Sequence, residues 1–557
     1  MTSQAEIPYG LHGGFLASAQ RWPDRPALEL GDEVLDYAAL RGVASRIAVC
    51  LQSAEAGPES AEGARVGVLA HRSVAMYAGI LGTLMAGCVL VPLNPGFPAQ
   101  RSAAMVRLSG ARSLVVDAAG LAVLPALLTQ LEERAASAGA GQMDGLHIVL
   151  AGRLQTEAEA HAVAALVQDW PQHRFVTPEE AVPVDWQPVS VAPDSLACVF
   201  FTSGSTGVPK GVGVLHRNAL RFVDMSRERY GDAAPGLSEQ DRFSQFYDIT
   251  FDSSMFDLYV SWAFGACLCC PTAFEWVNPN KFIEARRLTV VDFVPSTGHA
   301  MNRGDAWRAG RFAGLRLCRF GGEALSAGLA ARLAEAAPHA VVENVYGPTE
   351  CTVDAAYYRW ARTRSPAECE HGIVPIGYAG NQVGLLVVDE HLQEVAPGEA
   401  GELLISGPQV TPGYWQDPAR TASVFIQVPG RSGVHYRTGD LVRRPADSGP
   451  IVYLGRMDQQ IKISGVRIEL GEIEQALCEL TGAELAVAVG WPLTDSGASG
   501  VVAFVAGVSG QDPVALREAL KQRLPAVMVP KTIHFMADFP LNVNGKIDRK
   551  ALLESLG

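Results

Sequence analysis

Short apolar runs that end near glycine or proline alternate with longer amphipathic stretches along the first part of the chain. Residues 65–70, 88–93, 113–117 and 197–202 are four of these runs. Apolar runs separated by helix-length segments are typical of strand–helix–strand units, which build parallel sheets covered by helices. The pattern therefore predicts an α/β protein. Because one domain holds roughly 100–200 residues, a chain of 557 residues should contain two or three sub-domains.

The pattern changes twice further along the sequence. From about residue 380 to 455, short strand-like runs are separated only by turns, which predicts a smaller β-rich sub-domain. A helix start at residues 469–480 is then followed by new strand-like runs, so the C-terminal part should form a separate small α+β domain. Residues 130–195 are rich in Ala, Glu and Gln and predict peripheral helices and loops.

The composition excludes several classes of protein. Apolar residues make up 48% of the chain and charged residues 19%, which is typical of globular proteins and not of disordered ones. The net charge of −14 argues against nonspecific nucleic-acid binding, because that needs a basic surface. The 10 cysteines have no paired spacing, which indicates a reducing compartment. We therefore expect a cytoplasmic protein with no nucleic-acid partner.

One uncharged stretch, residues 74–93, is long enough to span a bilayer. Gly79, Gly82 and Gly87 interrupt it, and Pro92 lies near its end. A buried helix followed by a buried strand explains the stretch better. The N-terminus also lacks the pattern of a secretory signal, so we expect no membrane partner.

The residues that follow the 197–202 run carry the clearest chemistry. Glycines let backbone amides converge on an anion, hydroxyls donate hydrogen bonds, and a lysine adds positive charge. The segment therefore predicts a phosphate-binding loop, although its glycine spacing differs from that of the common P-loop. Its residues are Thr202, Ser203, Gly204, Ser205, Thr206, Gly207, Lys210 and Gly211.

Lysine is rare in this chain, with 7 lysines and 38 arginines among the 45 basic residues. Where only positive charge is needed, the sequence uses arginine, so a retained lysine indicates a need for a compact ammonium on a flexible stem. This preference singles out Lys210, Lys462 and Lys546.

Several segments together resemble the adenylate-forming superfamily of acyl-CoA synthetases, beetle luciferases and nonribosomal peptide synthetase adenylation domains. TSGSTGVPKG is similar to its signature loop, and KISGVRIELGEIE and LNVNGKIDRKAL are similar to motifs of its amino-acid-activating branch. The resemblance covers nearly the whole chain. It implies a large N-terminal domain, residues 1–457, with two mixed or parallel sheets flanked by helices and a small β-rich sub-domain. A small mobile α+β domain, residues 458–557, would follow it.

The resemblance also implies a nucleotide site for ATP and Mg²⁺. Asn344 would hydrogen-bond the adenine amino group, Tyr346 would stack on the ring, and Asp440 would accept from the ribose hydroxyls. Glu350 would help to hold Mg²⁺, because this hard cation binds phosphate and carboxylate oxygens. The other nucleotide residues would be Gly321, Gly322, Glu323, Gly347, Arg456 and the phosphate-binding loop.

Four further residues receive roles in catalysis and domain movement from the resemblance. Thr349 would contact the α-phosphate, and Asp458 would be the hinge between the two domains. Lys462 would lie on a loop that reaches the site after rotation. Lys546 would be the main catalytic residue, because an ammonium relieves charge crowding as a carboxylate meets a phosphate.

The amino-acid pocket is partly readable. Asp252 matches the aspartate that binds the substrate α-ammonium in the amino-acid-activating branch. Two acids and an arginine in the pocket imply a polar or charged substrate side chain, since an apolar one would leave them unpaired. Alternatively, the three charges pair with one another and shape a small pocket for serine or threonine. Counted without gaps, the lining residues are Ser253, Phe256, Asp292, Arg319, Gly321, Val345, Val353 and Asp354, of which Arg319 departs from the usual apolar residue.

We therefore expect an AMP-forming ligase that makes aminoacyl-AMP from ATP and an amino acid. It would then load the phosphopantetheine thiol of a carrier protein, as in nonribosomal peptide synthesis. No carrier domain follows Lys546 in the sequence, so the carrier should act in trans. Whether a small activating partner protein takes part stays open.

Two alternatives remain for the function. Asp252 and the C-terminal motifs argue against an acyl-CoA ligase for a non-amino carboxylic acid. Lys546, Glu350 and Asp440 argue against a non-catalytic nucleotide-binding protein.

Cysteines 267, 269 and 270 have no second ligand pair at zinc spacing, so we expect buried strand residues there.

Overall fold

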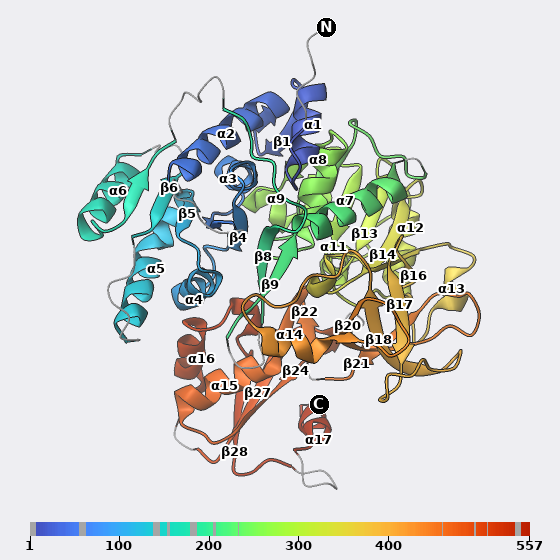
Figure 1. Ribbon diagram of the computed structural model, residues 1–557. Helices are drawn as coiled ribbons and strands as arrows, with labels where there is room; N and C mark the ends of the chain where they lie inside the picture. The colour runs from blue at the N-terminus through green and yellow to red at the C-terminus, as the bar shows by residue number, and fades with distance from the viewer. Residues whose placement is uncertain are drawn as a thin grey trace.

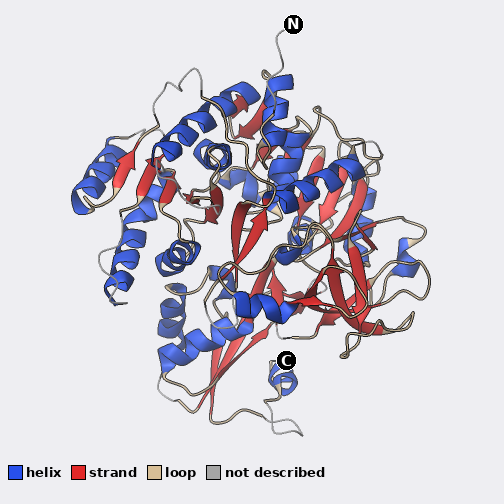
Figure 2. Cartoon of the chain, viewed as in Figure 1, coloured by secondary structure: helices blue, strands red, loops and turns tan. Residues whose placement is uncertain are grey.

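Helices and strands alternate through most of the computed structural model, which confirms the α/β prediction (Figures 1 and 2). The structure describes residues 7–54, 63–137, 145–152, 156–178, 186–203, 208–231, 233–458, 460–494, 497–508, 511–540 and 547–556.

The first large sheet has seven strands in the order β7-β6-β5-β3-β4-β8-β9. All neighbours are parallel except β8 and β9. The four apolar runs seen in the sequence form β3, β4, β5 and β8, but β6 and β7 lie in the region predicted as helices and loops alone, so that prediction was incomplete. The strands are β3 (Arg65–Leu69), β4 (Val89–Leu93), β5 (Ser113–Val116), β6 (His147–Leu150), β7 (Arg174–Val176), β8 (Leu196–Thr202) and β9 (Lys210–Leu215).

Residues 74–93 form a buried helix and a buried strand, as predicted. The helix begins after Ser73, whose side chain accepts from the Met76 amide, and Gly87 (φ +77°) leads into the strand. Within the described part of the chain, none of the helices combines the length and the apolarity that a membrane crossing needs. The helices of this region are α2 (Tyr37–Ala54), α3 (Val74–Met85), α4 (Ala99–Ser109), α5 (Ala118–Ser137) and α6 (Glu157–Asp169).

The second large sheet has nine strands in the order β16-β15-β14-β13-β12-β10-β11-β1-β2. Its six central strands are parallel, and the edge strands β2, β15 and β16 are antiparallel. The strands are β1 (Pro26–Leu30), β2 (Glu33–Asp36), β10 (Arg242–Ser244), β11 (Cys267–Cys270), β12 (Val290–Phe293), β13 (Leu317–Phe320), β14 (Val341–Tyr346), β15 (Ala356–Arg359) and β16 (Tyr378–Ala379).

The largest hydrophobic core joins the two sheets. It contains Ile80 of α3 and Phe200 of β8 from one side and Leu28 of β1 and Phe243 of β10 from the other. Burial of this shared apolar surface holds the sheets in one body. The helices and helical turns around the second sheet are α1 (Gly13–Arg21), α7 (His216–Tyr230), the π-helical turn η1 (Phe256–Val260), α8 (Ser261–Ala263), α9 (Ala273–Val277), α10 (Pro279–Ala285), α11 (Pro295–Met301), α12 (Ala327–Ala336), η2 (Thr349–Cys351) and α13 (Ser365–Glu368).

A smaller antiparallel sheet forms the predicted β-rich sub-domain. Its order is β17-β18-β20-β19, with β21 paired to β20. The elements are β17 (Gly384–Val388), β18 (Ala400–Ser406), α14 (Pro418–Val424), β19 (Phe425–Gln427), β20 (Val434–Arg443) and β21 (Val452–Arg456).

The C-terminal segment packs below these sheets in the view of Figure 1, where it is orange to red. It has its own core and a three-stranded sheet, β24-β27-β28, so the small α+β domain is confirmed. The boundary at residues 457 and 458 lies between β21 and β22 and remains a prediction. The elements are β22 (Gln460–Ile463), β23 (Val466–Glu469), α15 (Leu470–Thr481), β24 (Ala486–Gly490), β25 (Leu493–Thr494), β26 (Gly497–Ala498), β27 (Val501–Ala506), α16 (Pro513–Lys521), η3 (Ala526–Met528), β28 (Thr532–Met536) and α17 (Arg549–Glu554).

Candidate active site

The carboxyl ends of the central strands in the nine-stranded sheet carry many of the predicted site residues. Residues 321–323 follow β13 directly, and residues 347–350 follow β14. Ligand sites of open α/β sheets lie at this edge, where the loops after parallel strands meet. These loops line a cavity of about 690 Å³ together with Thr202, Ser203, Asp252, Ser253, Asp440, Arg456 and Lys462.

Three predicted nucleotide residues form one hydrogen-bonded group. The Tyr346 hydroxyl donates to Oδ2 of Asp440, and Arg456 Nη1 donates to Oδ1 of Asp440 at 2.8 Å. Burial and the nearby Asp440 charge raise the pKa of Tyr346 well above its usual value, so the phenol stays a donor. Asn344 Nδ2 donates to the Pro375 carbonyl at 2.9 Å. Its amide oxygen is then the atom suited to accept from an adenine amino group.

Lys210, the lysine predicted to bind phosphate, lies beside the C-terminal domain. Lys210 opens β9 and pairs across the ladder with Thr202, the last residue of β8. Its Nζ lies 3.0 Å from Oε1 of Glu469 in β23. Burial lowers the pKa of Lys210, and the neighbouring acids Glu350 and Glu469 counteract this. Four predicted loop residues, Gly204, Ser205, Thr206 and Gly207, lie outside the described residues.

Glu350 is completely buried and is bound by two side chains. It accepts hydrogen bonds from Arg467 Nη1 at 3.1 and 3.2 Å and from the Tyr414 hydroxyl at 2.7 Å. Burial opposes its ionisation, but the Arg467 and Lys210 charges outweigh that effect and lower the pKa of Glu350 to about 2. A buried carboxylate that stays ionised needs a cation beside it. In this arrangement that cation is Arg467, and the role of Glu350 as a Mg²⁺ ligand remains a prediction.

The β22–β23 hairpin of the C-terminal domain enters this site. The amide of Gly465 at its tip donates to Glu323 Oε1 at 2.8 Å, and the same glycine lies against Gly322. Ser203 Oγ donates to the Arg467 carbonyl at 2.6 Å. Lys462 lines the cavity, where burial lowers its pKa and Asp440 counteracts the decrease. The hairpin thus contributes charged groups to the nucleotide site.

A third ion pair joins the two domains, outside the hairpin. Arg101 Nη1 of α4 lies 2.5 Å from Glu472 Oε1 of α15, and both side chains are buried.

Asp458, the predicted hinge, lies between β21 and β22 and accepts from Arg456 Nε at 3.0 Å. Lys546 lies outside the described residues, so its position relative to the site is not described.

Asp252 is held by the loop that follows β14. Its Oδ2 accepts from the Val353 amide at 3.3 Å. Burial and the nearby Glu350 charge raise the pKa of Asp252 to about 6, although hydrogen bonds from Val353 and Thr349 oppose this. A partly buried acid that faces a cavity and accepts one backbone hydrogen bond suits an ammonium ligand.

The backbone around this contact is strained. Thr352 (φ +53°) and Val353 (φ +70°) both adopt left-handed conformations, which are costly for β-branched residues. A Cβ on Gly347 would lie 2.1 Å from the Val353 carbonyl oxygen, so only glycine fits at position 347. The turn thereby points the Val353 amide at Asp252.

The three charged residues predicted in the amino-acid pocket pair with one another. Arg319 is completely buried, and its Nη2 donates to Asp354 Oδ2 at 2.6 Å. Its Nη1 lies 3.4 Å from Asp292 Oδ2, and its guanidinium lies 3.6 Å from the centre of the Phe256 ring. Burial raises the pKa of Asp292 to about 7, and Arg319 opposes this increase. The charges thus pair with one another, as in the alternative that the sequence left open, and the size of the pocket remains a prediction.

Further charged residues extend this buried chain away from the pocket. Arg229 lies 3.7 Å from Asp354 and 3.2 Å from Glu343, and Arg359 lies 3.1 Å from Glu343. On the other side, Gly321 packs against Val345, where a Cβ would lie 3.0 Å from Cγ2. Of the residues predicted to line the amino-acid pocket, Asp252 and Ser253 line the 690 Å³ cavity, whereas Arg319 and its two acids are buried behind it.

Sequence reasoning missed several of these residues. Arg467 lies in KISGVRIELGEIE, so its motif was recognised but its contact with Glu350 was not. Tyr414, Arg229, Glu343 and the strained Thr352 gave no local signal, because each acts through residues that are distant in the sequence or through backbone geometry.

A second cavity, of about 750 Å³, lies on another side of the hairpin tip. Phe251 lines both cavities, and Ser464 at the hairpin tip lines the second one. The rest of its wall includes His71, Arg72, Tyr247, Asp248, Trp276 and Val294.

The cysteines of β11 are buried, as predicted. Within the described ranges, Glu29, Cys267 and Cys269 form one group with three metal-ligand atoms close together. Glu29, however, is bound by Arg242 at 2.6 Å and Arg286 at 2.9 Å. Two guanidinium groups on the carboxylate disfavour a cation there, which agrees with the structural role expected for these cysteines.

Comparison with known proteins agrees with this geometry. The chain matches the AMP-binding enzyme family over residues 15–415 and the AMP-binding enzyme C-terminal domain over residues 472–546. It is 31% identical over 549 residues to tyrocidine synthase 3 of Brevibacillus parabrevis, which covers 97% of this chain and 8% of that protein. It is 34% identical over 561 residues to phosphinothricin tripeptide synthetase PhsC of Streptomyces viridochromogenes, covering 98% and 45%. The chain thus spans less than half the length of these two relatives.

Solved structures are similar over the full length. The Vibrio cholerae adenylation domain AlmE in complex with glycyl-adenosine-5'-phosphate is 30% identical, with a TM-score of 0.84 and coverage of 100% of this chain and 99% of that one. IdnL7 is 33% identical, with a TM-score of 0.70 and 99% coverage of both chains. With these matches, the resemblance seen in the motifs is confirmed: the chain belongs to the AMP-binding enzyme family and is an AMP-forming ligase.

Proposed function

We propose that this chain activates an amino acid with a small side chain as aminoacyl-AMP and loads it onto the phosphopantetheine thiol of a separate carrier protein. The observation that carries the proposal is Asp252, a partly buried carboxylate in the wall of the nucleotide cavity. A substrate carboxylate that must reach the α-phosphate would place its α-ammonium a short distance away, where an acid is needed.

Activation would use the residues already brought together. Asp440, Tyr346 and Arg456 would hold the ribose end, Asn344 would bind the adenine, and Glu350 would hold Mg²⁺, which would supply charge to neutralise the phosphates. Lys546 is placed by its motif at the substrate carboxylate. One carboxylate oxygen then forms a bond to the α-phosphorus, and pyrophosphate leaves with the electrons of the broken bond.

The size of the substrate follows from the buried charge cluster. Asp292, Arg319 and Asp354 use their charges on one another, so a large charged side chain would have to break these pairs in a buried site. Phe256 lies against Arg319 and narrows the same region. The glycyl-adenosine phosphate bound by the similar AlmE supports a small substrate. We therefore infer glycine, alanine, serine or threonine.

The thiol would approach through the second cavity. Phe251 and the hairpin tip border it, so a thiol entering there reaches the wall shared with the nucleotide cavity. Between the two half-reactions, rotation about Asp458 would move Lys546 out of the site and bring the hairpin into it. Similarity to a peptide synthetase supports a carrier protein as the acceptor.

The test is pyrophosphate exchange with all proteinogenic amino acids, followed by loading of phosphopantetheinylated carrier domains. We expect the highest rates with amino acids no larger than threonine, and a thioester on the carrier. Exchange that is fastest with glutamate, arginine or leucine would refute the small pocket. Activity with a plain fatty acid and free coenzyme A, and none with amino acids, would refute the amino-acid assignment.

A further inference from the structure

The short helix α9 exposes an unusual amount of apolar surface. Phe274 is 81% exposed, Val277 is 83% exposed and Trp276 is 46% exposed, within a helix of five residues. Residues three apart lie on one face of a helix, so Phe274 and Val277 share a face. We call these three side chains the α9 patch. Single exposed apolar residues are normal, but a contiguous group marks an interaction site.

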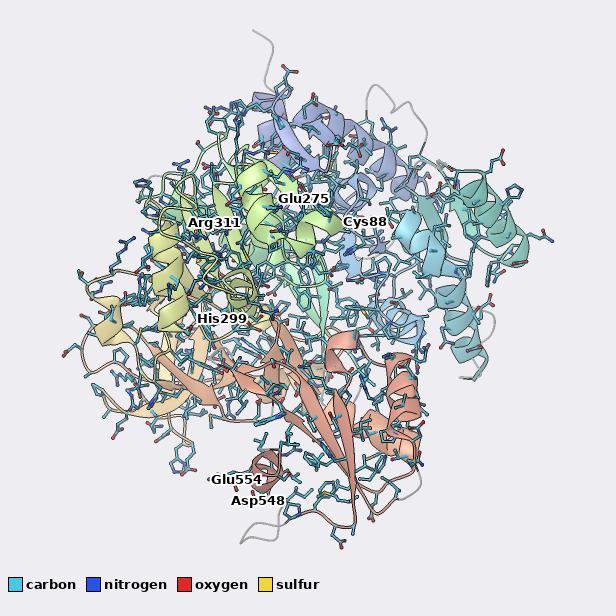
Figure 3. The ribbon with its side chains drawn as sticks, turned by 180° about the vertical axis from the view of Figure 1, so that it is seen from behind. Cys88, Glu275, His299, Arg311, Asp548 and Glu554 are labelled. Carbon is cyan, nitrogen blue, oxygen red and sulfur yellow. The ribbon has the colours of Figure 1, made fainter. Side chains whose placement is uncertain are left out.

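The α9 patch stands on a rigid support. Thr272 and Glu275 form a capping box, in which the Thr272 hydroxyl accepts from the Glu275 amide and Glu275 Oε2 accepts from the Thr272 amide at 2.9 Å. Arg286 Nε of the next segment donates to Glu275 Oε1 at 2.7 Å. Figure 3 labels Glu275 on this helix. Because the helix is fixed before any partner binds, docking would not require ordering it, which favours affinity.

The α9 patch lies at the rim of the second cavity. Pro271, Thr272, Ala273 and Trp276 all line that cavity, while Phe274 and Val277 project outside it. The Trp276 ring is held in the wall, because the Arg72 guanidinium lies 4.1 Å from its centre. The cavity continues from this rim to Phe251 and Ser464 beside the nucleotide site.

We propose that the α9 patch docks the carrier protein while its phosphopantetheine arm occupies the second cavity. This inference rests on the proposed function. A partner that uses both features must combine a protein surface with a long thin arm that ends in a thiol, and a phosphopantetheinylated carrier does so. The surface of the carrier beside its modified serine would be apolar, since aromatic and aliphatic side chains in the centre of an interface provide most of its binding energy.

The test separates protein docking from thiol entry. The double variant Phe274→Ser/Val277→Ser removes the outer face of the α9 patch and leaves the cavity wall intact. The matched control is Val167→Ser/Val434→Ser, two exposed valines on α6 and β20. The acceptors are free pantetheine and the phosphopantetheinylated carrier domain that the wild-type enzyme loads best among a panel. Pyrophosphate exchange is measured for each enzyme.

We expect the patch variant to keep pyrophosphate exchange and transfer to free pantetheine within about twofold, and to lose at least about tenfold in kcat/KM for the carrier. The control should match the wild type with both acceptors. An unchanged kcat/KM for the carrier would overturn the docking proposal, as would an equal loss with carrier and pantetheine, because that loss would arise in the cavity. If the wild-type enzyme forms aminoacyl-AMP but loads no carrier, the proposed transfer itself fails and docking fails with it.

Discussion

Arg467 donates from a single nitrogen, Nη1, to both carboxylate oxygens of Glu350, at 3.2 and 3.1 Å. The hairpin of the C-terminal domain thereby places a cation on the acid that the motif assigns to Mg²⁺. The same hairpin also places an acid on a cation of the large domain, because Glu469 pairs with Lys210. The domain movement that we propose would break both pairs, so single substitutions should affect the two half-reactions differently.

Replacement of Arg467 by alanine should impair thiol transfer far more than adenylate formation. Without Arg467, the buried Glu350 loses its strongest cationic partner in the arrangement seen here, and breaking a buried pair typically costs about 3–5 kcal/mol. We expect pyrophosphate exchange within about threefold of wild type and at least a tenfold loss of thioester formation. Arg523→Ala, which removes an exposed ion pair with Glu479, is the control. Equal loss of both activities would refute this effect of the domain movement.

Asp458→Pro should block carrier loading and leave adenylate formation largely intact. Proline fixes φ near −65°, so rotation at this one position is restricted. Pyrophosphate exchange and thioester formation are measured side by side. If Asp458→Pro keeps full thioester formation, the hinge lies at another residue.

Lys546→Ala should nearly abolish adenylate formation while ATP still binds. Removal of one charge that stabilises a transition state costs roughly 10²–10³ in rate. Single-turnover formation of aminoacyl-AMP measures the loss, and equilibrium ATP binding serves as the control. A variant within threefold of the wild-type rate would contradict the role taken from the motif.

Amino-acid binding should weaken below about pH 6. The pKa of Asp252 is raised to about 6, mainly by burial, so this acid becomes neutral as the pH falls through that value. A neutral Asp252 cannot pair with an α-ammonium. The kcat/KM for the amino acid should therefore fall about tenfold for each pH unit below pH 6. Between about pH 7 and pH 8, where the substrate keeps its α-ammonium, the profile should be flat. The Asp252→Asn variant should be much less active, and its kcat/KM should not fall further as the pH decreases below 6. A fall that persists in this variant would arise from another titrating group.

Arg319→Leu should destabilise the protein, and more so at high pH. It leaves Asp292 and Asp354 buried with one cation fewer, a loss of about 3–5 kcal/mol for a buried pair. Both acids have raised pKa values through burial, and Arg319 now holds those values down. Without it their pKa values rise further, so the folded variant binds protons more tightly than the unfolded chain and loses stability as the pH increases.

Thermal unfolding at pH 5 and pH 8 tests this expectation. The deficit of Arg319→Leu relative to wild type should be smaller at pH 5, and the second substitution Asp354→Asn should restore part of it. A melting temperature equal to wild type at pH 8 would show that the charge cluster contributes nothing to stability.

The sequence predicts what local patterns encode. Buried parallel strands such as β3 and β8 are continuous apolar runs and were recognised, whereas β7 has three residues, Arg174–Val176, and is too short to stand out. The charge pairing in the amino-acid pocket remained undecided, because Arg319 meets Asp354 only through folding. For the same reason Tyr414 was not connected with Glu350, 64 residues away in the chain.

Gly347 connects the nucleotide motif with the turn that faces Asp252, because no side chain fits at this position. This glycine belongs to the nucleotide motif, yet the atom that a Cβ would strike is the carbonyl of Val353, whose amide faces Asp252. In the function proposed above, nucleotide and amino acid would thus contact residues that one backbone turn connects. A change in the nucleotide motif at this position would be felt first as a loss of selectivity for the amino acid, so the two recognition events can evolve only as a pair.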